Sequence, residues 1–332
     1  MIKTTRIVKF YETGEPEVMK YEEVPIPEPG AGEIRIKVEA IGVGFGETLY
    51  RRGRYVQETV LPSKLGNNAV GTVEAVGSDV TNPKVGERVA IIPSFEMNKY
   101  GVYGEHAIVP AFSAAPYIES LSLVENAAIW IQIITAYVAL IYYGKINTND
   151  FVLLTPASGG VGQAAIQTVK KAGATSIATT RSRKKVDMLK ETGADHVIVT
   201  SEEDIEERIK EITEGKGVRI VFNALTGSIM ETLVNITQPG GTIFQYGGIG
   251  GKDTLLPYPR LISAGIKIQG YTLYELTYHP ENLSALKDYV VSGIKDGFYT
   301  ANADRTFDFE RLIEVHHYLE AGDLSGSVVV TV

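Results

Sequence analysis

One glycine-rich segment of the chain has the residue types and spacing of a turn that binds the phosphates of a dinucleotide. Ala157, Gly159 and Gly162 stand at the three glycine positions of the pattern G-x-G-x-x-G. The segment follows an apolar strand predicted over 151–155 and opens a helix predicted over 161–171. Gly159 would let the backbone approach a pyrophosphate, and Gly162 would let the helix, with its free N–H groups, pack closely on the strand. The alternative is a tight packing turn without a ligand.

The residues after the next predicted strand, 176–180, indicate which dinucleotide this would be. A protein that binds NAD usually carries an acid about 20 residues after the turn, where it accepts the ribose 2′-hydroxyl. Here Thr180 is followed by Arg-Ser-Arg-Lys-Lys, and no acid occurs before Asp187. Hydroxyls and cations suit a 2′-phosphate, so the segment predicts NADPH. A solvated helix start is the alternative.

Several kinds of chemistry are excluded by residue types. The chain has no cysteine, which excludes disulfides, cysteine-ligated zinc, iron–sulfur clusters and thiol nucleophiles. No G-x-S-x-G nucleophile turn occurs. The five histidines lack ligand spacing with another plausible ligand pair; they are His106, His196, His279, His316 and His317.

The charge and hydropathy of the chain limit the classes of partner and the cell compartment that we expect for it. The chain has 32 Lys+Arg against 40 Asp+Glu, a net charge of −8, which argues against nucleic acid or an anionic membrane as a partner. The uncharged stretch from Ala127 to Tyr143 is just short of the ~20 residues of a membrane-spanning helix, and we expect a buried core helix there. The first residues lack the apolar region of a signal peptide, so we expect a cytoplasmic protein.

The pattern of elements predicts an α/β protein of two domains, the number expected for 332 residues. Up to about residue 120, short Val- and Ile-rich strands alternate with turns, which is typical of an antiparallel β domain. From about residue 120 onward, strands and helices alternate, which predicts a parallel sheet. The further predicted strands are 196–199, 219–223, 242–246 and 327–332, and the further helices are 184–191, 203–214 and 309–320.

Four segments of the chain together resemble the medium-chain dehydrogenase/reductase superfamily, in its zinc-free NADPH:quinone oxidoreductase (zeta-crystallin-like) branch. They are the glycine turn and the segments 47–55, 132–137 and 193–198. The resemblance implies a GroES-like catalytic domain over 1–120 and a doubly wound Rossmann NADP-binding domain over 121–270, with the active-site cleft between them. It implies a tail over 271–332 that completes the Rossmann domain and returns to the first. It also implies a homodimer formed by Rossmann edge strands near 266–273.

The resemblance further implies which residues bind NADPH. Lys185 matches the lysine that reaches the 2′-phosphate, and the loop from Tyr246 to Gly248 matches the loop beside the nicotinamide. Asn223 stands at the end of the fourth strand, where the family cradles the cofactor. The full predicted set is Thr135, Ser158, Gly159, Gly160, Val161, Gly162, Thr180, Arg181, Lys185, Asn223, Tyr246, Gly247, Gly248 and Gly326.

The positions that hold zinc in metal-dependent members of the superfamily have other residues here. Those members use a cysteine, then a histidine followed by a glutamate, where this chain has Gly44, Asn67 and Asn68. None of the three is a plausible zinc ligand, so we expect catalysis without a metal. The branch usually carries asparagine at Gly44, aspartate at Glu47 and glutamate at Asn68, and these departures leave the substrate open.

Tyr55 is the predicted catalytic residue, because its position matches a tyrosine found at the cleft in this branch. Hydride transfer to a carbonyl compound builds negative charge on oxygen, which a hydrogen-bond donor stabilises. Tyrosine, with an ordinary pKa of about 10, is such a donor at neutral pH. A packing role is the alternative for Tyr55. Tyr50, Trp130 and Tyr274 are expected in a core, with a place lining the cleft as the alternative for each.

These residues together predict an NADPH-dependent enzyme that transfers hydride to a quinone or an α,β-unsaturated carbonyl. A metal-free carbonyl or alcohol oxidoreductase and an enoyl-thioester reductase are alternatives within the enzymes. An NADPH-binding redox sensor with little turnover is an alternative of another class, motivated by Gly44 and Asn68.

Overall fold

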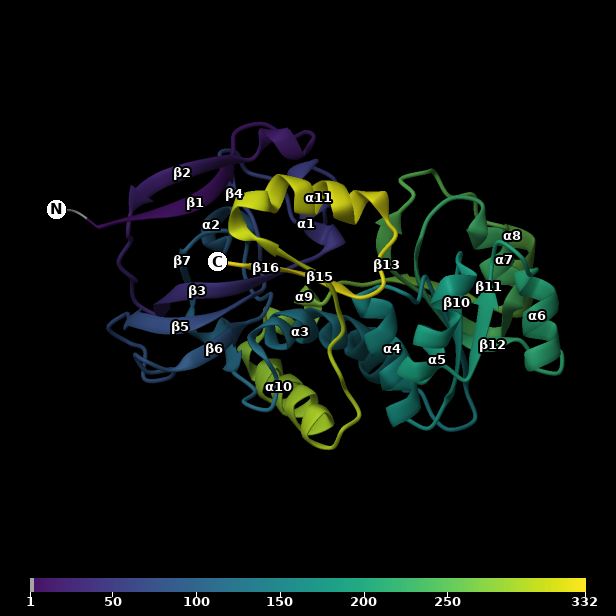
Figure 1. The fold of residues 1–332 in the computed structure, drawn as a ribbon. Coiled ribbons are helices and arrows are strands. Elements are labelled where there is room, and N and C mark those ends of the chain that lie inside the picture. The colour runs from purple at the N-terminus through teal and green to yellow at the C-terminus, as the bar shows by residue number, and fades with distance from the viewer. Residues whose placement is uncertain (1–2) are drawn as a thin grey trace. The chain divides into compact units, whose positions relative to one another are not determined.

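A computed structural model describes residues 3–332, which form two compact units (Figure 1). The first unit runs to Ile131 and also contains Tyr274–Val291 and Ala301–Val332. The second unit contains Gln132–Leu273 and Ser292–Thr300. Residues 1 and 2, which the predicted first domain includes, lie outside the described residues.

The second unit is built on a six-stranded sheet in the order β11-β10-β9-β12-β13-β14, with every neighbouring pair parallel. The strands are β9 (Phe151–Thr155), β10 (Thr175–Thr180), β11 (His196–Val199), β12 (Val218–Leu225), β13 (Thr237–Ile249) and β14 (Lys267–Gly270). The helices are α4 (Gly160–Lys171), η4 (Arg183–Lys185), α5 (Val186–Thr192), α6 (Ile205–Ile212), α7 (Ile229–Ile236) and α8 (Tyr258–Ala264). The predicted parallel sheet is confirmed.

The helices of this unit form two groups, because right-handed crossovers lie on opposite faces of a parallel sheet when the order of the strands reverses, as it does between β9 and β12. Helix α4 packs on α5, whereas α7 packs on both α6 and α8. Leu153 of β9, Ile177 of β10 and Val221 of β12 share one core with α6 and α7. The helix predicted from residue 184 begins instead at Val186, because a 3₁₀ turn precedes it.

The long apolar segment is a buried helix in two parts. Helix α3 (Leu123–Tyr137) continues into a π-helical stretch, η3 (Val138–Tyr143). At the helix start, Ser122 N donates to the Glu125 carboxylate and Glu125 N donates to Ser122 Oγ, the reciprocal pair of a capping box. The segment is long and apolar enough to cross a membrane, yet 67% of its most apolar window is buried inside the protein. This burial agrees with the predicted core helix.

The first unit contains a seven-stranded sheet, in the order β15-β16-β3-β5-β6-β8 with β7 also on β3, and a three-stranded sheet, β2-β1-β4. The strands are β1 (Thr4–Phe10), β2 (Lys20–Pro25), β3 (Glu33–Val43), β4 (Ser63–Lys64), β5 (Ala69–Val76), β6 (Arg88–Ile91), β7 (His106–Pro110), β8 (Ala114–Pro116), β15 (Ala303–Asp308) and β16 (Ser327–Thr331). The helices are η1 (Pro16–Val18), α1 (Phe45–Arg51), α2 (Met97–Tyr100), η2 (Ala111–Ser113), α9 (Tyr274–Thr277), α10 (Pro280–Lys295), η5 (Phe309–Arg311) and α11 (Leu312–Ala321).

Strand β3 is central to this unit because its side chains alternate between core and surface. Ile34, Ile36 and Val38 are buried, as period-2 apolar residues predict. Its far end pairs antiparallel with β16, where Val328 lies opposite Val43. The last strand therefore lies in the same sheet as β3 of the first unit.

A buried polar network ties α1 to α11. The Arg51 guanidinium donates to His316 Nδ1 at 2.9 Å and forms an ion pair with Glu320. Because a guanidinium can only donate, His316 Nδ1 is unprotonated, and Nε2 carries the hydrogen that it donates to Tyr103 Oη at 3.1 Å. Burial lowers the pKa of His316 to about 3. The network thus needs a neutral His316.

This network predicts a loss of stability in acid. In the unfolded chain His316 takes up a proton near pH 6.5, whereas in the folded chain it stays neutral to about pH 3. Stability from this group is therefore complete above pH 6.5 and falls by up to about 1.4 kcal/mol per pH unit below it. We expect H316Q to be less stable than wild type at pH 7, with the gap narrowing from pH 6.5 to pH 4 in urea unfolding.

The exposed residue His279 provides the matched control. H279Q should stay within about 0.5 kcal/mol of wild type across this pH range. A wild-type-to-H316Q difference that does not change with pH would contradict the neutral, buried state of His316.

Candidate active site

The predicted cofactor residues of the second unit gather at one edge of its sheet. Strands β9, β10, β12 and β13 are parallel, so their carboxyl ends lie at the same edge. Thr155 at the end of β9 lies opposite Asn223 of β12. The chain order reverses between these two strands, because β10 follows on one side of β9 and β12 lies on the other. Ligands of open α/β sheets bind at such a switch point.

The glycine turn at this edge has the geometry that the pattern requires. A side chain on Gly162 would place its Cβ 2.5 Å from Ala157 Cα, so only glycine lets α4 lie this close to the strand end. A Cβ on Gly159 would meet nothing within 4 Å. Gln163 Nε2 donates to Ser158 O at 2.8 Å and fixes the loop. The turn therefore combines tight packing, an open backbone and a helix amino terminus, which fit a pyrophosphate.

The segment after β10 carries the cations that the sequence relates to a 2′-phosphate. Arg183 forms an ion pair with Glu202, which follows β11, and this pairing partly neutralises its charge. Arg181 and Lys185 are the predicted cofactor residues of this segment, and Thr180 precedes them as the buried last residue of β10. The contact of Arg181 and Lys185 with a 2′-phosphate stays a prediction.

The remaining predicted cofactor residues of this unit line the ends of α3, β12 and β13. Asn223 is fully buried, and its side chain bonds Leu225 and Gln245, so it holds the loop after β12. Tyr246 stacks on Phe222 with ring centroids 4.1 Å apart, and burial raises its pKa. Two further predicted positions, Gly247 and Gly248, follow it within β13. Thr135 lies in α3, where its carbonyl accepts a hydrogen bond from Tyr271 Oη.

Gly326 is the one predicted cofactor residue that belongs to the first unit. It directly precedes β16, and a Cβ there would lie 2.5 Å from Asn302 O. This close approach explains the glycine by packing alone. Its role toward a cofactor stays a prediction.

Tyr55 belongs to a cluster of tyrosines in the first unit. Its ring covers Gly46 in α1, where a Cβ would lie 3.1 Å from Tyr55 Cε2. Tyr50 and Tyr274 contact it edge-on, each with a ring centroid 6.4 Å away. Tyr55 Oη donates to Tyr274 Oη at 3.4 Å. Burial raises the pKa of Tyr55 to about 12, so its hydroxyl is protonated at neutral pH.

Tyr274 belongs to the same cluster, and the sequence favours a core position for it over a place that lines a cleft. It is buried, with 6% of its surface exposed, and Tyr50 and Trp130 are buried as predicted. Its hydroxyl also accepts a hydrogen bond from Asn67 Nδ2 at 3.0 Å. Because Tyr274 lies 219 residues after Tyr55, no local pattern in the sequence indicates their contact.

The positions that match zinc ligands are occupied by backbone and amide groups. Gly44 N donates to Glu47 Oε2 at 3.1 Å, and burial raises the pKa of the Glu47 carboxyl to about 7. Asn68 Nδ2 donates to Ala127 O at 2.8 Å, and Asn67 donates to the tyrosine cluster. Across residues 3–332, no group of three His, Asp or Glu side chains could hold a metal ion.

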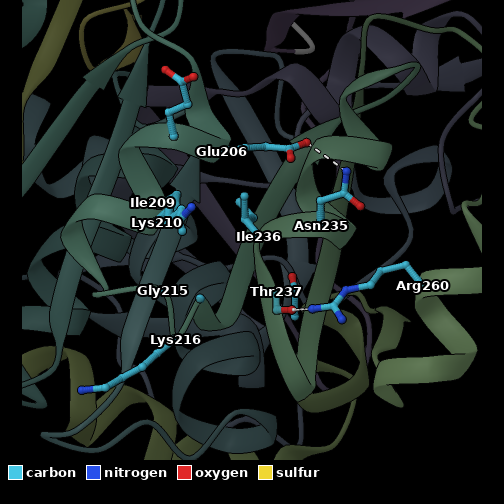
Figure 2. Close-up of a pocket in the computed structure, with 11 residues that line it drawn as sticks. Glu206, Ile209, Lys210, Gly215, Lys216, Asn235, Ile236, Thr237 and Arg260 are labelled. Carbon is cyan, nitrogen blue, oxygen red and sulfur yellow. Dashed lines mark hydrogen bonds between the residues drawn. The ribbon is translucent and has the colours of Figure 1, made fainter.

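A separate groove of about 340 Å³ lies at the opposite edge of the second unit's sheet (Figure 2). Its lining includes Gly217 and Thr237, which adjoin the amino ends of β12 and β13. Figure 2 shows that Asn235 bonds Glu206 and that Arg260 bonds the Thr237 carbonyl. Among the described residues, the groove shares none with the predicted cofactor set.

Comparison with known proteins places this site in a family. Residues 30–117 match the alcohol dehydrogenase GroES-like domain, and residues 160–288 match the zinc-binding dehydrogenase family. A quinone oxidoreductase of Pseudomonas aeruginosa is 30% identical over 97% of this chain and 98% of its own length. A 2-haloacrylate reductase of a Burkholderia species is 28% identical over 97% of each chain. The structure of Escherichia coli quinone oxidoreductase complexed with NADPH superposes with a TM-score of 0.91 at 29% identity, over 98% of this chain and all of that one.

The chain belongs to the medium-chain dehydrogenase/reductase superfamily, in its zinc-free quinone oxidoreductase branch. The predicted family and the predicted combination of a GroES-like domain with a Rossmann domain are confirmed. The chain is accordingly an oxidoreductase.

Proposed function

We propose that this protein is an NADPH-dependent reductase that transfers hydride to a quinone or to an α,β-unsaturated carbonyl. The observation that carries the proposal is the glycine turn at the sheet's switch point, with Arg181 and Lys185 after the neighbouring strand. The proposal is supported by the similarity to an NADPH-complexed quinone oxidoreductase and to a 2-haloacrylate reductase, whose name denotes an unsaturated substrate.

The residues of the second unit would hold the cofactor. The open backbone at Gly159 and the first N–H groups of α4 would bind the pyrophosphate. Arg181 and Lys185 would bind the 2′-phosphate through charge-assisted hydrogen bonds. The loop from Tyr246 to Gly248 would lie beside the nicotinamide. When bound, NADPH supplies the hydride for the reaction.

The residues of the first unit would stabilise the charge that this transfer creates. In an enone, hydride adds to the β-carbon, the π electrons move to the carbonyl oxygen, and a solvent proton completes the α-carbon. In a quinone, hydride and one solvent proton together give the hydroquinone. A protonated hydroxyl of the Tyr55–Tyr274 pair would donate to the oxygen that becomes negative. No metal is needed for this step.

Three alternative functions differ from the proposed one in the substrate that the protein would reduce, or in whether it reduces one at all. A metal-free carbonyl or alcohol oxidoreductase would reduce saturated aldehydes, and an enoyl-thioester reductase would reduce enones only as thioesters. A redox sensor would bind NADPH without turnover. The branch usually carries other residues at Gly44 and Asn68, so the substrate panel is used to choose among these alternatives.

A substrate panel tests the proposed function. NADPH oxidation is followed at 340 nm with 1,4-naphthoquinone, trans-2-hexenal, a crotonyl thioester and hexanal in separate reactions. We expect turnover with the quinone or the free enal and none with hexanal. Activity on hexanal alone would favour the carbonyl reductase, and activity on the thioester alone would favour the enoyl-thioester reductase. Tight NADPH binding without any turnover would favour the sensor.

The cofactor preference is tested by removing the two cations. Loss of charge-assisted bonds to a 2′-phosphate should raise the Kd for NADPH about 10-fold or more in the R181A/K185A variant, while the Kd for NADH changes less than about twofold. Fluorescence titration measures both constants. K184A, which removes a neighbouring exposed charge, is the matched control and should bind NADPH as wild type does. Equal weakening for both dinucleotides would contradict the assignment.

We also propose that the protein is a homodimer formed through the edge of its six-stranded sheet. Strand β14 ends that sheet, so one of its sides has no partner strand among residues 3–332. Leu255, Tyr258 and Ile262, which precede it, are at least two-thirds exposed, at 88%, 69% and 77%. Sedimentation velocity should give about twice the chain mass of 36.1 kDa. The variant L255E/I262E should shift the protein toward monomer, and a monomeric wild type would contradict the proposal.

A further inference from the structure

The hydrogen bonds of the tyrosine cluster distinguish its two hydroxyls. Tyr55 Oη donates its single hydrogen to Tyr274 Oη at 3.4 Å. Asn67 Nδ2 donates to the same oxygen at 3.0 Å. A phenolic oxygen has two acceptor sites and one hydrogen. Both acceptor sites of Tyr274 are therefore occupied, and its own hydrogen remains to be donated.

The unused hydroxyl hydrogen of Tyr274 lies in a buried environment, where a polar group without a hydrogen-bond partner is energetically unfavourable. Tyr274 is 6% exposed, so water reaches its hydroxyl poorly. Its surroundings are aromatic, with Tyr55 on one side and the Tyr278 ring centroid 4.9 Å away on another. A buried donor without an acceptor destabilises the folded protein. An oxygen acceptor from a ligand would remove that destabilisation.

Asn67 gives a second, independent indication of a missing partner. The residue is 4% exposed, and its Oδ1 has no hydrogen-bond partner although the atom is buried. Its other amide atom is fixed on Tyr274, so Oδ1 is held in place. The cluster thus leaves one donor and one acceptor unused. Because buried polar atoms are almost always paired in folded proteins, a ligand that supplies both an acceptor and a donor would complete the cluster.

We propose that Tyr274 is a catalytic residue whose hydroxyl donates to the substrate's carbonyl oxygen, and that Tyr55 and Asn67 are positioning residues that fix this hydroxyl by donating to it. The inference rests on the proposed function and deepens it. It reassigns the hydrogen-bond donor from Tyr55, which the sequence predicted, to the neighbouring tyrosine. Asn67 Oδ1 would accept from a donor that arrives with the ligand.

The kinetic test compares tyrosine-to-phenylalanine variants with 1,4-naphthoquinone and NADPH. Removing one preorganised donor to a developing oxyanion lowers the rate about 100-fold, and we expect this loss of kcat/KM in Y274F. Y55F should lose no more than about 10-fold, because Tyr274 keeps its hydrogen and its bond from Asn67. Y278F keeps the neighbouring ring of the same segment and should match wild type. The Kd for NADPH should stay within twofold in all three.

The variant N67D separates positioning from a structural role. An ionised aspartate would accept the hydrogen of Tyr274 and so withdraw it from the substrate. We expect kcat to fall about as far as in Y274F at pH 8 and to recover toward wild type as the pH is lowered and the aspartate is protonated. Y274F itself should show no such recovery. Circular dichroism and NADPH titration verify the fold of each variant.

The outcomes distinguish this inference from the proposed function. Wild-type kcat/KM in Y274F, or a larger loss in Y55F than in Y274F, would overturn the role of Tyr274 while quinone reduction by the wild type still stands. A pH-independent loss in N67D would overturn the positioning role of Asn67. A wild type that binds NADPH but reduces no substrate would overturn the proposed function itself.

Discussion

The close packing of α4 on the end of β9 positions the groups at the carboxyl edge of the second unit's sheet, where the predicted cofactor residues lie. Because Gly162 has no side chain, the helix lies so near the strand that a Cβ would stand 2.5 Å from Ala157. Ala157 N is in turn bonded to Thr179 O of β10, so the turn is attached to two strands. The first N–H groups of α4 are thereby held at the carboxyl edge of the sheet, where the loops after β10, β12 and β13 also begin. A bulkier residue at 162 would move all of these groups apart.

The first unit depends on a different constraint, which is that its buried polar groups must find partners. Arg51 at the end of α1 is fully buried, and His316 and Glu320 of α11 receive its hydrogens. This network holds the helix that carries Glu47 and underlies Tyr55. Elsewhere in this unit, Asn67 donates to the Tyr274 hydroxyl and Asn68 donates to the Ala127 carbonyl. Asn67 Oδ1 is buried there without a hydrogen-bond partner, and the proposed role of Tyr274 rests in part on this observation.

Much of the fold could be predicted because its signals are local. The predicted strand 196–199 coincides with β11, and 176–180 lies within β10, since short apolar runs between helices are typical of a parallel sheet. Strand β15 was not predicted. It pairs only with β16, at the end of the sheet, and Phe307 is its one buried residue, so its side chains show no alternation. The extension of β13 to Ile249 was also missed, because its two glycine pairs are typical of turns.

The sequence by itself determined the glycine turn of residues 157–162 and the replacement of the zinc-ligand positions by Gly44, Asn67 and Asn68. Both depend on residue identity within a few positions, so neither needs distant contacts. Only the tertiary structure decided which groups meet across the chain: Arg183 with Glu202, and Tyr274 with Tyr55 and Asn67. The physical reason is that a hydrogen bond depends on distance in space, and 219 residues separate Tyr55 from the hydroxyl that accepts its hydrogen. The sequence predicted one tyrosine as the donor, and the folded chain shows that its neighbour holds the unused hydrogen.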